Sequence, residues 1–232
     1  MHHFSWLGHF LKIDEHYIHI AHAGMTSLVL ILLGIVAYAK LSKTEKALVP
    51  ASKIGVAGIF EVACESILNL MESIIGHDAK KFFPLIATLF IYIFVNNLLG
   101  VIPGFLPPTD NINTTLACGV VVFFYFNYVG IKEQGLIPYL KHFGGPIIFL
   151  APLMFIIEMI GVLVRPVSLA LRLFGNITGD HMVLGIFSDL VPIGVPVIFL
   201  ALGIFVSFIQ AFVFSLLSTI YVSLALPHDD HH

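Results

Sequence analysis

A run of ionisable and polar side chains inside an apolar region is the feature of this sequence most able to do chemistry. Residues 165–181 read RPVSLALRLFGNITGDH and lie in the longest apolar region of the chain. On a helix, the polar side chains that recur every three or four residues form one stripe: Arg165, Ser168, Arg172, Asn176 and Asp180. A central Arg in a membrane costs about 2.5 to 3.5 kcal/mol on insertion scales, so the stripe must face protein or water.

The overall composition indicates the class of protein that carries this stripe. Hydrophobic residues make up 58% of the 232 positions and charged residues 11%, and the mean hydropathy is +0.99. A soluble domain could not cover its surface with so few polar residues, so the sequence predicts a polytopic, all-α membrane protein. The net charge of -3 is small and gives no reason to expect a nucleic-acid partner.

Histidine and cysteine are present, but their spacing is not that of a metal site. Histidines gather near both ends of the chain, at 2, 3, 9, 16, 19 and 22 and in the tail PHDDHH, without convincing ligand spacing. Cys64 and Cys118 stand alone in apolar contexts and are interpreted as packing residues. We therefore expect no metal and no cofactor, and we expect no cleaved signal peptide.

Apolar runs divide the chain into membrane segments, and the lysines orient them. We expect a single membrane domain over residues 1–232, made of an external segment at 1–22, a first helix at 23–41, an interfacial helix at 51–76, a hairpin at 82–131 and a long hairpin at 146–226. Lysines fall at 40–53, 78–81 and 132–141, which alternate with lysine-free turns. Because cytoplasmic loops carry the excess of basic residues, we predict about five transmembrane helices, an external N-terminus and a cytoplasmic C-terminus.

The segment 51–76 differs from the spans in its acidic residues. Glu61, Glu65, Asn69 and Glu72 recur every three to four residues and so share one face of a helix. Such an amphipathic helix is expected to lie along the cytoplasmic interface rather than to cross the membrane.

The last two apolar runs are longer than an upright span requires. A continuous helix over 146–187 would be about 63 Å long at 1.5 Å per residue, about twice the hydrocarbon core. Two spans hinged near Arg165 and Pro166 fit this length, and so does one strongly tilted helix. The run 197–226 presents the same alternatives. Its small and polar residues keep helical spacing, so antiparallel packing of the two runs would bring Gln210 near Arg172.

Several of these stretches resemble subunit a of the bacterial F-type ATP synthase membrane sector. The resemblance rests on RPVSLALRLFGNITGDH and FIQAFVFSLLSTIYVSLAL, and extends to FFPLIATLFIYIFVNNLLGVIP and PTDNINTTLA, covering the chain from about Glu61. It implies a proton-translocating stator subunit in the bacterial inner membrane. The implied partners are the ring of c subunits, the peripheral-stalk b subunits and, indirectly, the remaining synthase subunits, together with membrane lipid and protons.

The resemblance also implies roles for particular residues. Arg172 is the stator arginine, which faces the essential carboxylate of the rotating c ring. The implied proton path contains Glu158, Asn176, Asp180, His181, Gln210, Asn97 and Asn113, and the supporting residues are Arg165, Ser168 and Ser207. The chain departs from the family pattern in having His181 and Gly203 with Asp180 beside the histidine, so Asp180, His181 or both are candidates for the relay. The loop reads TDN where TND is usual, which leaves the role of Asp110 open.

A physical mechanism agrees with this resemblance. A guanidinium stays charged at any accessible pH, so Arg172 cannot relay protons, but it stabilises the ionised form of a carboxylate beside it. A ring carboxylate that passes Arg172 must therefore release its proton. Two aqueous half-channels, offset around the ring, would let protons cross only as the rotor turns. Arg165 lies near the expected helix break, where a long basic side chain can snorkel, so we expect Lys to be tolerated there.

Two other classes of protein compete with this reading. A self-contained secondary transporter or proton channel commonly shows internal repeats, and no convincing repeat relates the halves of this chain. A non-transporting scaffold gives no reason for Arg172 in a polar stripe. The chain has no nucleotide-binding loop with the required Lys and Ser/Thr, so ATP chemistry belongs to partner subunits and we expect no catalytic site of its own. The sequence favours H+ over Na+ without fixing the coupling ion, the ring size or the direction of net catalysis.

Overall fold

The computed structural model describes residues 17–41, 56–102, 105–142, 150–191 and 194–227. Within these ranges the chain forms seven α-helices joined by short 3-10 turns, and no strand. Five helices are long and apolar enough to cross a membrane: α2 (Ile18–Leu41), α4 (Ala79–Leu99), α5 (Ile112–Gln134), α7 (Ala151–Leu190) and α8 (Val195–Ala225). The prediction of an all-α, polytopic membrane protein with five spans is confirmed.

Helix α2 begins before its predicted start at residue 23. The helix runs from Ile18 because the polar residues that interrupt the apolar pattern are satisfied by the helix backbone. His22 Nδ1 lies 3.1 Å from the Ile18 carbonyl oxygen, and Thr26 Oγ1 donates to the His22 carbonyl at 2.9 Å. The rest of the predicted external segment, 1–16, lies outside the described residues, as do positions 51–55 and 146–149 of two other predicted segments.

The structure of α7 excludes one of the two geometries that its length allowed, two spans hinged near Arg165 and Pro166. It is one uninterrupted helix of 40 residues that continues through Pro166. At 1.5 Å per residue it is about 60 Å long, twice the thickness of a hydrocarbon core. Proline removes one backbone hydrogen bond, but here the helix is buttressed by α5, whose Gly119 lies so close that a Cβ there would be 2.6 Å from the Pro166 carbonyl oxygen.

Helices α7 and α8 form an antiparallel hairpin, and the pairing of residues across it keeps the same register from one end to the other. Near the turn the rings of Phe187 and Phe199 stack with centroids 4.7 Å apart. At the other end the Arg165 guanidinium lies over the Tyr221 ring of α8, 5.4 Å from its centroid. The hairpin therefore pairs the polar stripe of α7 with α8 along most of its length.

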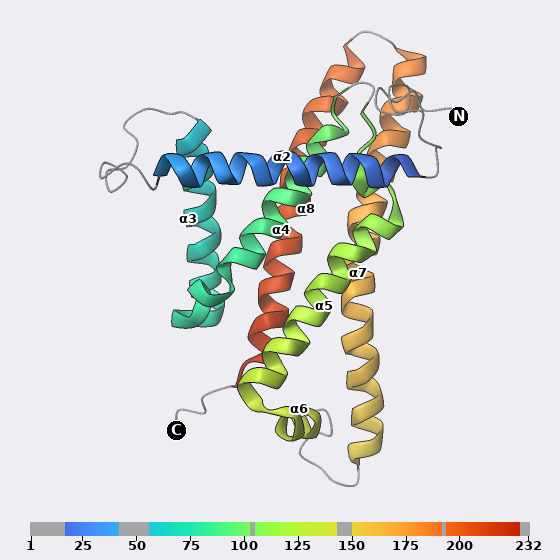
Figure 1. The fold of residues 1–232 in the computed structure, drawn as a ribbon. Coiled ribbons are helices and arrows are strands. Elements are labelled where there is room, and N and C mark those ends of the chain that lie inside the picture. Colours follow the sequence, from blue (N-terminus) through green and yellow to red (C-terminus); the bar gives the residue numbers. More distant parts are fainter. Residues whose placement is uncertain (1–16, 42–55, 103–104, 143–149, 192–193, 228–232) are drawn as a thin grey trace.

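Helix α2 lies across the direction in which α7 and α8 run (Figure 1). Its apolar part, Ile18–Val36, has 19 residues and is about 28 Å long, the thickness that an upright helix crosses. If α2 stands upright in the membrane, the α7–α8 hairpin is steeply tilted, as its length predicts. The tilt relative to the bilayer stays a prediction, with this crossing as its support.

Helix α3 (Val56–Ile75) is amphipathic, as the spacing of its acidic residues predicts. It exposes Glu65, Asn69 and Glu72, and it buries Ile67 and Met71 in the hydrophobic core. It packs on α4 and α8, and like them it runs across α2 in Figure 1. This arrangement suits a helix that lies along an interface, although its position relative to the membrane stays a prediction.

The core that positions the polar stripe lies between α4, α5, α7 and α8. Phe82 and Ile86 of α4, Phe126 of α5, Leu173 of α7 and Phe214 of α8 are at most 2% exposed. Leu173 directly follows Arg172 in α7. Its burial fixes the rotation of α7 and thereby directs its neighbour outward.

Candidate functional site

Arg172 points away from the core of the described chain. Its side chain is exposed, and it makes no hydrogen bond or ion pair with any residue that the structure describes. The adjacent Leu171 is 51% exposed, and Val167, one turn earlier, is 45% exposed. A permanently charged guanidinium therefore sits in an apolar outer surface of α7, which is costly in a membrane unless a partner of opposite charge covers it.

The hairpin register joins the predicted Gln210 to Asn176, one helical turn from Arg172. Asn176 Nδ2 donates to Gln210 Oε1 at 2.7 Å, and Gln210 is only 3% exposed. Asn176 lies one helical turn from Arg172, so the two residues share a face of α7. Ser168, half-buried, lies one turn before Arg172, and Ser207, buried, lies one turn before Gln210.

Asp110 is a functional candidate whose role the sequence left open. It lies in the 3-10 helix η4 (Pro108–Asp110), which packs on α7. Thr178 Oγ1 donates to Asp110 Oδ1 at 2.7 Å, and His181 Nδ1 lies 3.8 Å from Asp110 Oδ2. The turn-forming TDN was the signal for Asp110 in the sequence. The partners of Asp110 are 68 and more residues away, so the sequence did not show them.

Asp180 and His181 each fit against a glycine of a neighbouring helix. A Cβ placed on Gly203 of α8 would lie 2.7 Å from Asp180 Oδ2, and one placed on Gly100, at the end of α4, would lie 2.7 Å from His181 Nε2. The glycines thus make the room that these side chains occupy. We call Asp110, Thr178, Asp180 and His181 the Asp110 cluster.

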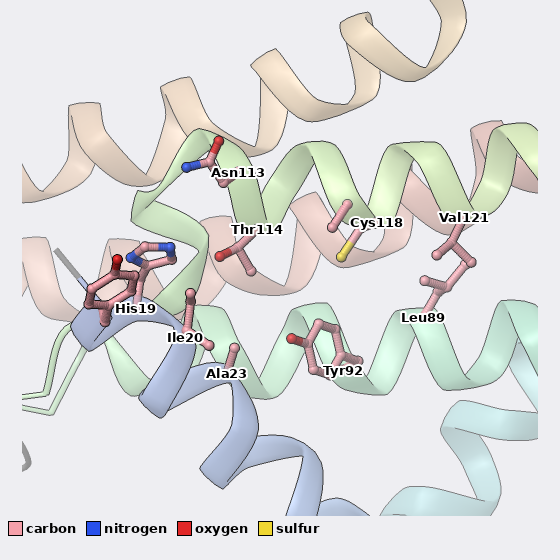
Figure 2. Close-up of a pocket in the computed structure, with 11 residues that line it drawn as sticks. His19, Ile20, Ala23, Leu89, Tyr92, Asn113, Thr114, Cys118 and Val121 are labelled. Atoms are coloured by element: carbon pink, nitrogen blue, oxygen red, sulfur yellow. The ribbon is translucent and has the colours of Figure 1, made fainter.

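The two asparagines predicted on the proton path lie beside this cluster. Asn97 of α4 is buried, and its Oδ1 accepts a hydrogen bond from Thr109, the neighbour of Asp110, at 2.8 Å. Asn113 is exposed at the start of α5, where its backbone NH donates to the N-cap residue Asn111. It lines a cavity of about 500 Å³ between α2, α4 and α5, with His19 and Tyr92 also on the wall (Figure 2).

A second charged group lies towards the other end of α7. Arg165 Nη2 lies 3.3 Å from Glu158 Oε1, and its guanidinium faces the rings of Phe126 (5.9 Å) and Tyr221 (5.4 Å). Helix α6 (Leu136–His142) completes this region. Burial raises the pKa of Tyr139 in α6, which keeps its hydroxyl protonated to donate to Asn127 Oδ1 at 3.0 Å. We call Glu158, Arg165, Phe126 and Tyr221 the Arg165 cluster.

The two clusters lie on either side of Arg172 along α7. Arg165 precedes it by seven residues and Asp180 follows it by eight, which is about 10 Å and 12 Å along the helix axis. Every predicted site residue except Asn97, Asn113, Ser207 and Gln210 lies on α7. The arrangement can hold and pass protons at two separate places, with a fixed positive charge between them.

The fold and this site define a class: a polytopic helical membrane protein with ionisable groups distributed along one long hairpin. A family model described as ATP synthase A chain matches residues 23–223. ATP synthase subunit a of Bdellovibrio bacteriovorus is 48% identical over 97% of this chain and 99% of its own length. The corresponding proteins of Trichlorobacter lovleyi and Geobacter sulfurreducens are 50% and 47% identical, over 91% and 97% of this chain and 92% and 98% of their own lengths.

The chain therefore belongs to the ATP synthase A chain family. The prediction of a membrane-sector subunit of the bacterial ATP synthase is confirmed at this level.

Proposed function

We propose that this chain is the stator against which the c ring turns, and that protons travel through it in two offset half-channels that meet the ring on either side of Arg172. The exposure of Arg172 on the outer face of α7, without a partner among the described residues, carries this proposal. An ionised ring carboxylate is the partner of opposite charge that such an arginine requires. The apolar surroundings strengthen the attraction because they exclude water.

The Asp110 cluster and the Arg165 cluster are the ends of the two half-channels in this mechanism. A proton that enters beside Asp110 passes to Asp180 or His181 and then to a ring carboxylate. After a turn of the ring it leaves beside Glu158, because Arg172 stabilises the ionised carboxylate and blocks the direct route. The hydrogen bond between Gln210 and Asn176 fixes the orientation of α7 about its own axis, which keeps Arg172 facing the ring.

The lysines support an assignment of the two sides. Lys81 at the start of α4 pairs with Glu133 at the end of α5, so both helix ends lie on one side, together with Lys132. Tyr139 of α6 packs against Gly130 of α5 on that side, which is also the side of the Arg165 cluster. Basic residues favour the cytoplasm, so Glu158 faces the cytoplasm and Asp110 faces the outside. The N-terminus is then external and the C-terminus cytoplasmic.

The exposed apolar faces of the chain offer surfaces for the remaining partners, which are lipid, the b subunits and the c ring. Helix α2 exposes Leu28, Ile31, Leu32 and Ile35, a surface for lipid or for a helix of a peripheral-stalk b subunit. The face of the α7–α8 hairpin that carries Arg172 then contacts the c ring. In this function the remaining synthase subunits act only indirectly, through the ring and the stalk.

The variant Arg172→Gln tests the proposal. In inverted vesicles with the assembled complex verified by blotting, ATP-driven acidification should be lost, since glutamine reaches similarly but carries no charge. Asp189→Asn, an exposed carboxylate near the hairpin turn, is the matched control and should pump normally. Near-normal pumping by Arg172→Gln would reject the stator mechanism. Proton transport by the purified chain alone would instead favour a self-contained transporter or channel.

A further inference from the structure

Three buried polar atoms belong to α2 and to the end of α4, two helices that pack against each other. Four buried side-chain N or O atoms of the described residues have no hydrogen-bond partner, and one of them is Ser215 Oγ of α8. The other three are His22 Nε2, Asn96 Oδ1 and Asn97 Nδ2. Each unpaired buried group costs about 1 to 3 kcal/mol, so three on two helices that pack together require an explanation.

We call the polar seam the buried polar side chains that α2, α4 and η4 contribute where these elements pack together: His22, Asn96, Asn97 and Thr109. Helix α2 packs on α4 and on η4, and the His22 ring meets the edge of Phe105 with centroids 6.0 Å apart. Tyr92 lies on the wall of the cavity, and its backbone carbonyl oxygen accepts a hydrogen bond from Asn96 Nδ2 at 2.8 Å. Beyond Asn97 the seam continues through Thr109 to Asp110.

The hydrogen-bonding capacity of the three atoms is complementary to that of water. His22 Nδ1 is engaged with the Ile18 carbonyl oxygen, which can only accept, so Nδ1 carries the proton of the neutral ring and Nε2 presents a lone pair. Asn96 Oδ1 is a second acceptor and Asn97 Nδ2 is a donor. Buried waters typically make about three hydrogen bonds to groups of this kind.

We propose that this seam is hydrated and forms the entry stretch of the outer half-channel, which leads to the Asp110 cluster, with His22 as a water-binding residue of the proton path. The proposal rests on the proposed function and extends it to α2, which carries none of the residues assigned above. Protons would pass from the cavity of Figure 2 along Tyr92, Asn96 and His22 to Asn97, Thr109 and the Asp110 cluster. The role of His22 is to accept a hydrogen bond from water at Nε2.

Silver accessibility tests the hydration directly. In the assembled complex with Cys64→Ala and Cys118→Ala, single cysteines would be placed at His22 and Asn97, and passive proton conduction through the membrane sector measured before and after Ag+. Ile93→Cys is the matched control, because Ile93 is fully buried in the core one turn before Asn97. Burial in a dry site lowers the thiolate fraction by about tenfold for each pKa unit, so only hydrated cysteines should react rapidly.

His22→Cys and Asn97→Cys should lose conduction to Ag+ at least about tenfold faster than Ile93→Cys, the ratio set by one pKa unit. Equal rates at His22 and Ile93 would overturn the proposal. This result would leave the stator mechanism standing, because the pumping activity of Arg172→Gln tests that mechanism separately.

A pair of substitutions separates the polar role of His22 from its packing role. His22→Phe keeps a ring against Phe105 but presents no polar atom, whereas His22→Gln keeps donor and acceptor groups. With equal assembly on blots, His22→Phe should conduct several-fold less than His22→Gln. Conduction by His22→Phe equal to or above that of His22→Gln would show that packing alone matters and would contradict the proposal. If His22→Phe does not assemble, the silver rates decide.

Discussion

The side chains of Asn176 and Gln210 are joined by a hydrogen bond of 2.7 Å across the α7–α8 hairpin, one helical turn from Arg172. Gln210 is almost fully buried, so its carbonyl oxygen depends on this partner. Asn176 in turn cannot rotate away without leaving that oxygen unpaired. The pair therefore fixes which way the face of α7 with Arg172 points.

The Asn176–Gln210 pair should behave as one unit in a double-mutant cycle. Asn176→Leu should lower ATP-driven pumping because it leaves the buried Gln210 amide unpaired at a cost of about 1 to 3 kcal/mol, and Gln210→Leu should lower it because Asn176 loses the bond that holds the face of α7 with Arg172. The double variant should lose less than the product of the two single losses, since no unpaired group remains. Pumping in inverted vesicles, normalised to assembled complex, gives the three values, and independent effects would contradict a coupled pair.

Asp110 should be required for proton conduction. Asp110→Asn keeps the shape of the side chain but removes the charge beside His181 and weakens the bond from Thr178. A hydrogen bond to a charged group contributes about 1.5 to 3 kcal/mol, so passive conduction should fall by about tenfold or more. Asp78→Asn, in the exposed turn before α4, is the control. Equal conduction by the two variants would remove Asp110 from the path.

Gly203 should be intolerant of side chains because of Asp180. A Cβ at this position would lie 2.7 Å from Asp180 Oδ2, whereas one at Gly185 of α7 would meet nothing within 4 Å. Gly203→Ala should therefore lower conduction and Gly185→Ala should not. If displacement of the Asp180 carboxylate is the cause, Gly203→Ala should have no further effect in an Asp180→Ala background. An additional loss there would point to a separate packing defect.

Arg165 should not tolerate lysine, contrary to the expectation from the sequence. That expectation assumed a helix break at Pro166, but α7 is continuous, and the guanidinium faces two aromatic rings and Glu158. A lysine loses the planar stacking, and cation–π contacts are worth about 0.5 to 2 kcal/mol. Arg165→Lys should lower pumping several-fold, and Arg165→Gln more. Native pumping rates in Arg165→Lys would favour the original expectation.

Labelling of single cysteines checks the assigned orientation. Lys80 and Asn113 are exposed near opposite ends of the α4–α5 hairpin, at the start of α4 and at the start of α5. In a background without Cys64 and Cys118, an impermeant maleimide should label Asn113→Cys in intact cells and Lys80→Cys only in inverted vesicles. Labelling of both from the same side would show that the positive-inside assignment is wrong.

The sequence by itself determined the class, the number of spans and the main candidate residues. These follow from local patterns: the length of apolar runs, the three-to-four-residue spacing of the stripe around Arg172, and the acidic face of α3. Such patterns depend only on neighbours in the chain, so they do not depend on the tertiary structure. The family resemblance rested on the same continuous motifs, and the comparisons confirmed it.

Only the tertiary structure decided what the long-range packing controls. Pro166 is a local signal for a break, but α7 continues because α5 packs against it at Gly119. Asp110 and Thr178 are 68 residues apart, and their bond exists only because η4 packs on α7. The same holds for the pairing of Gln210 with Asn176, because the register of two helices depends on every contact along both.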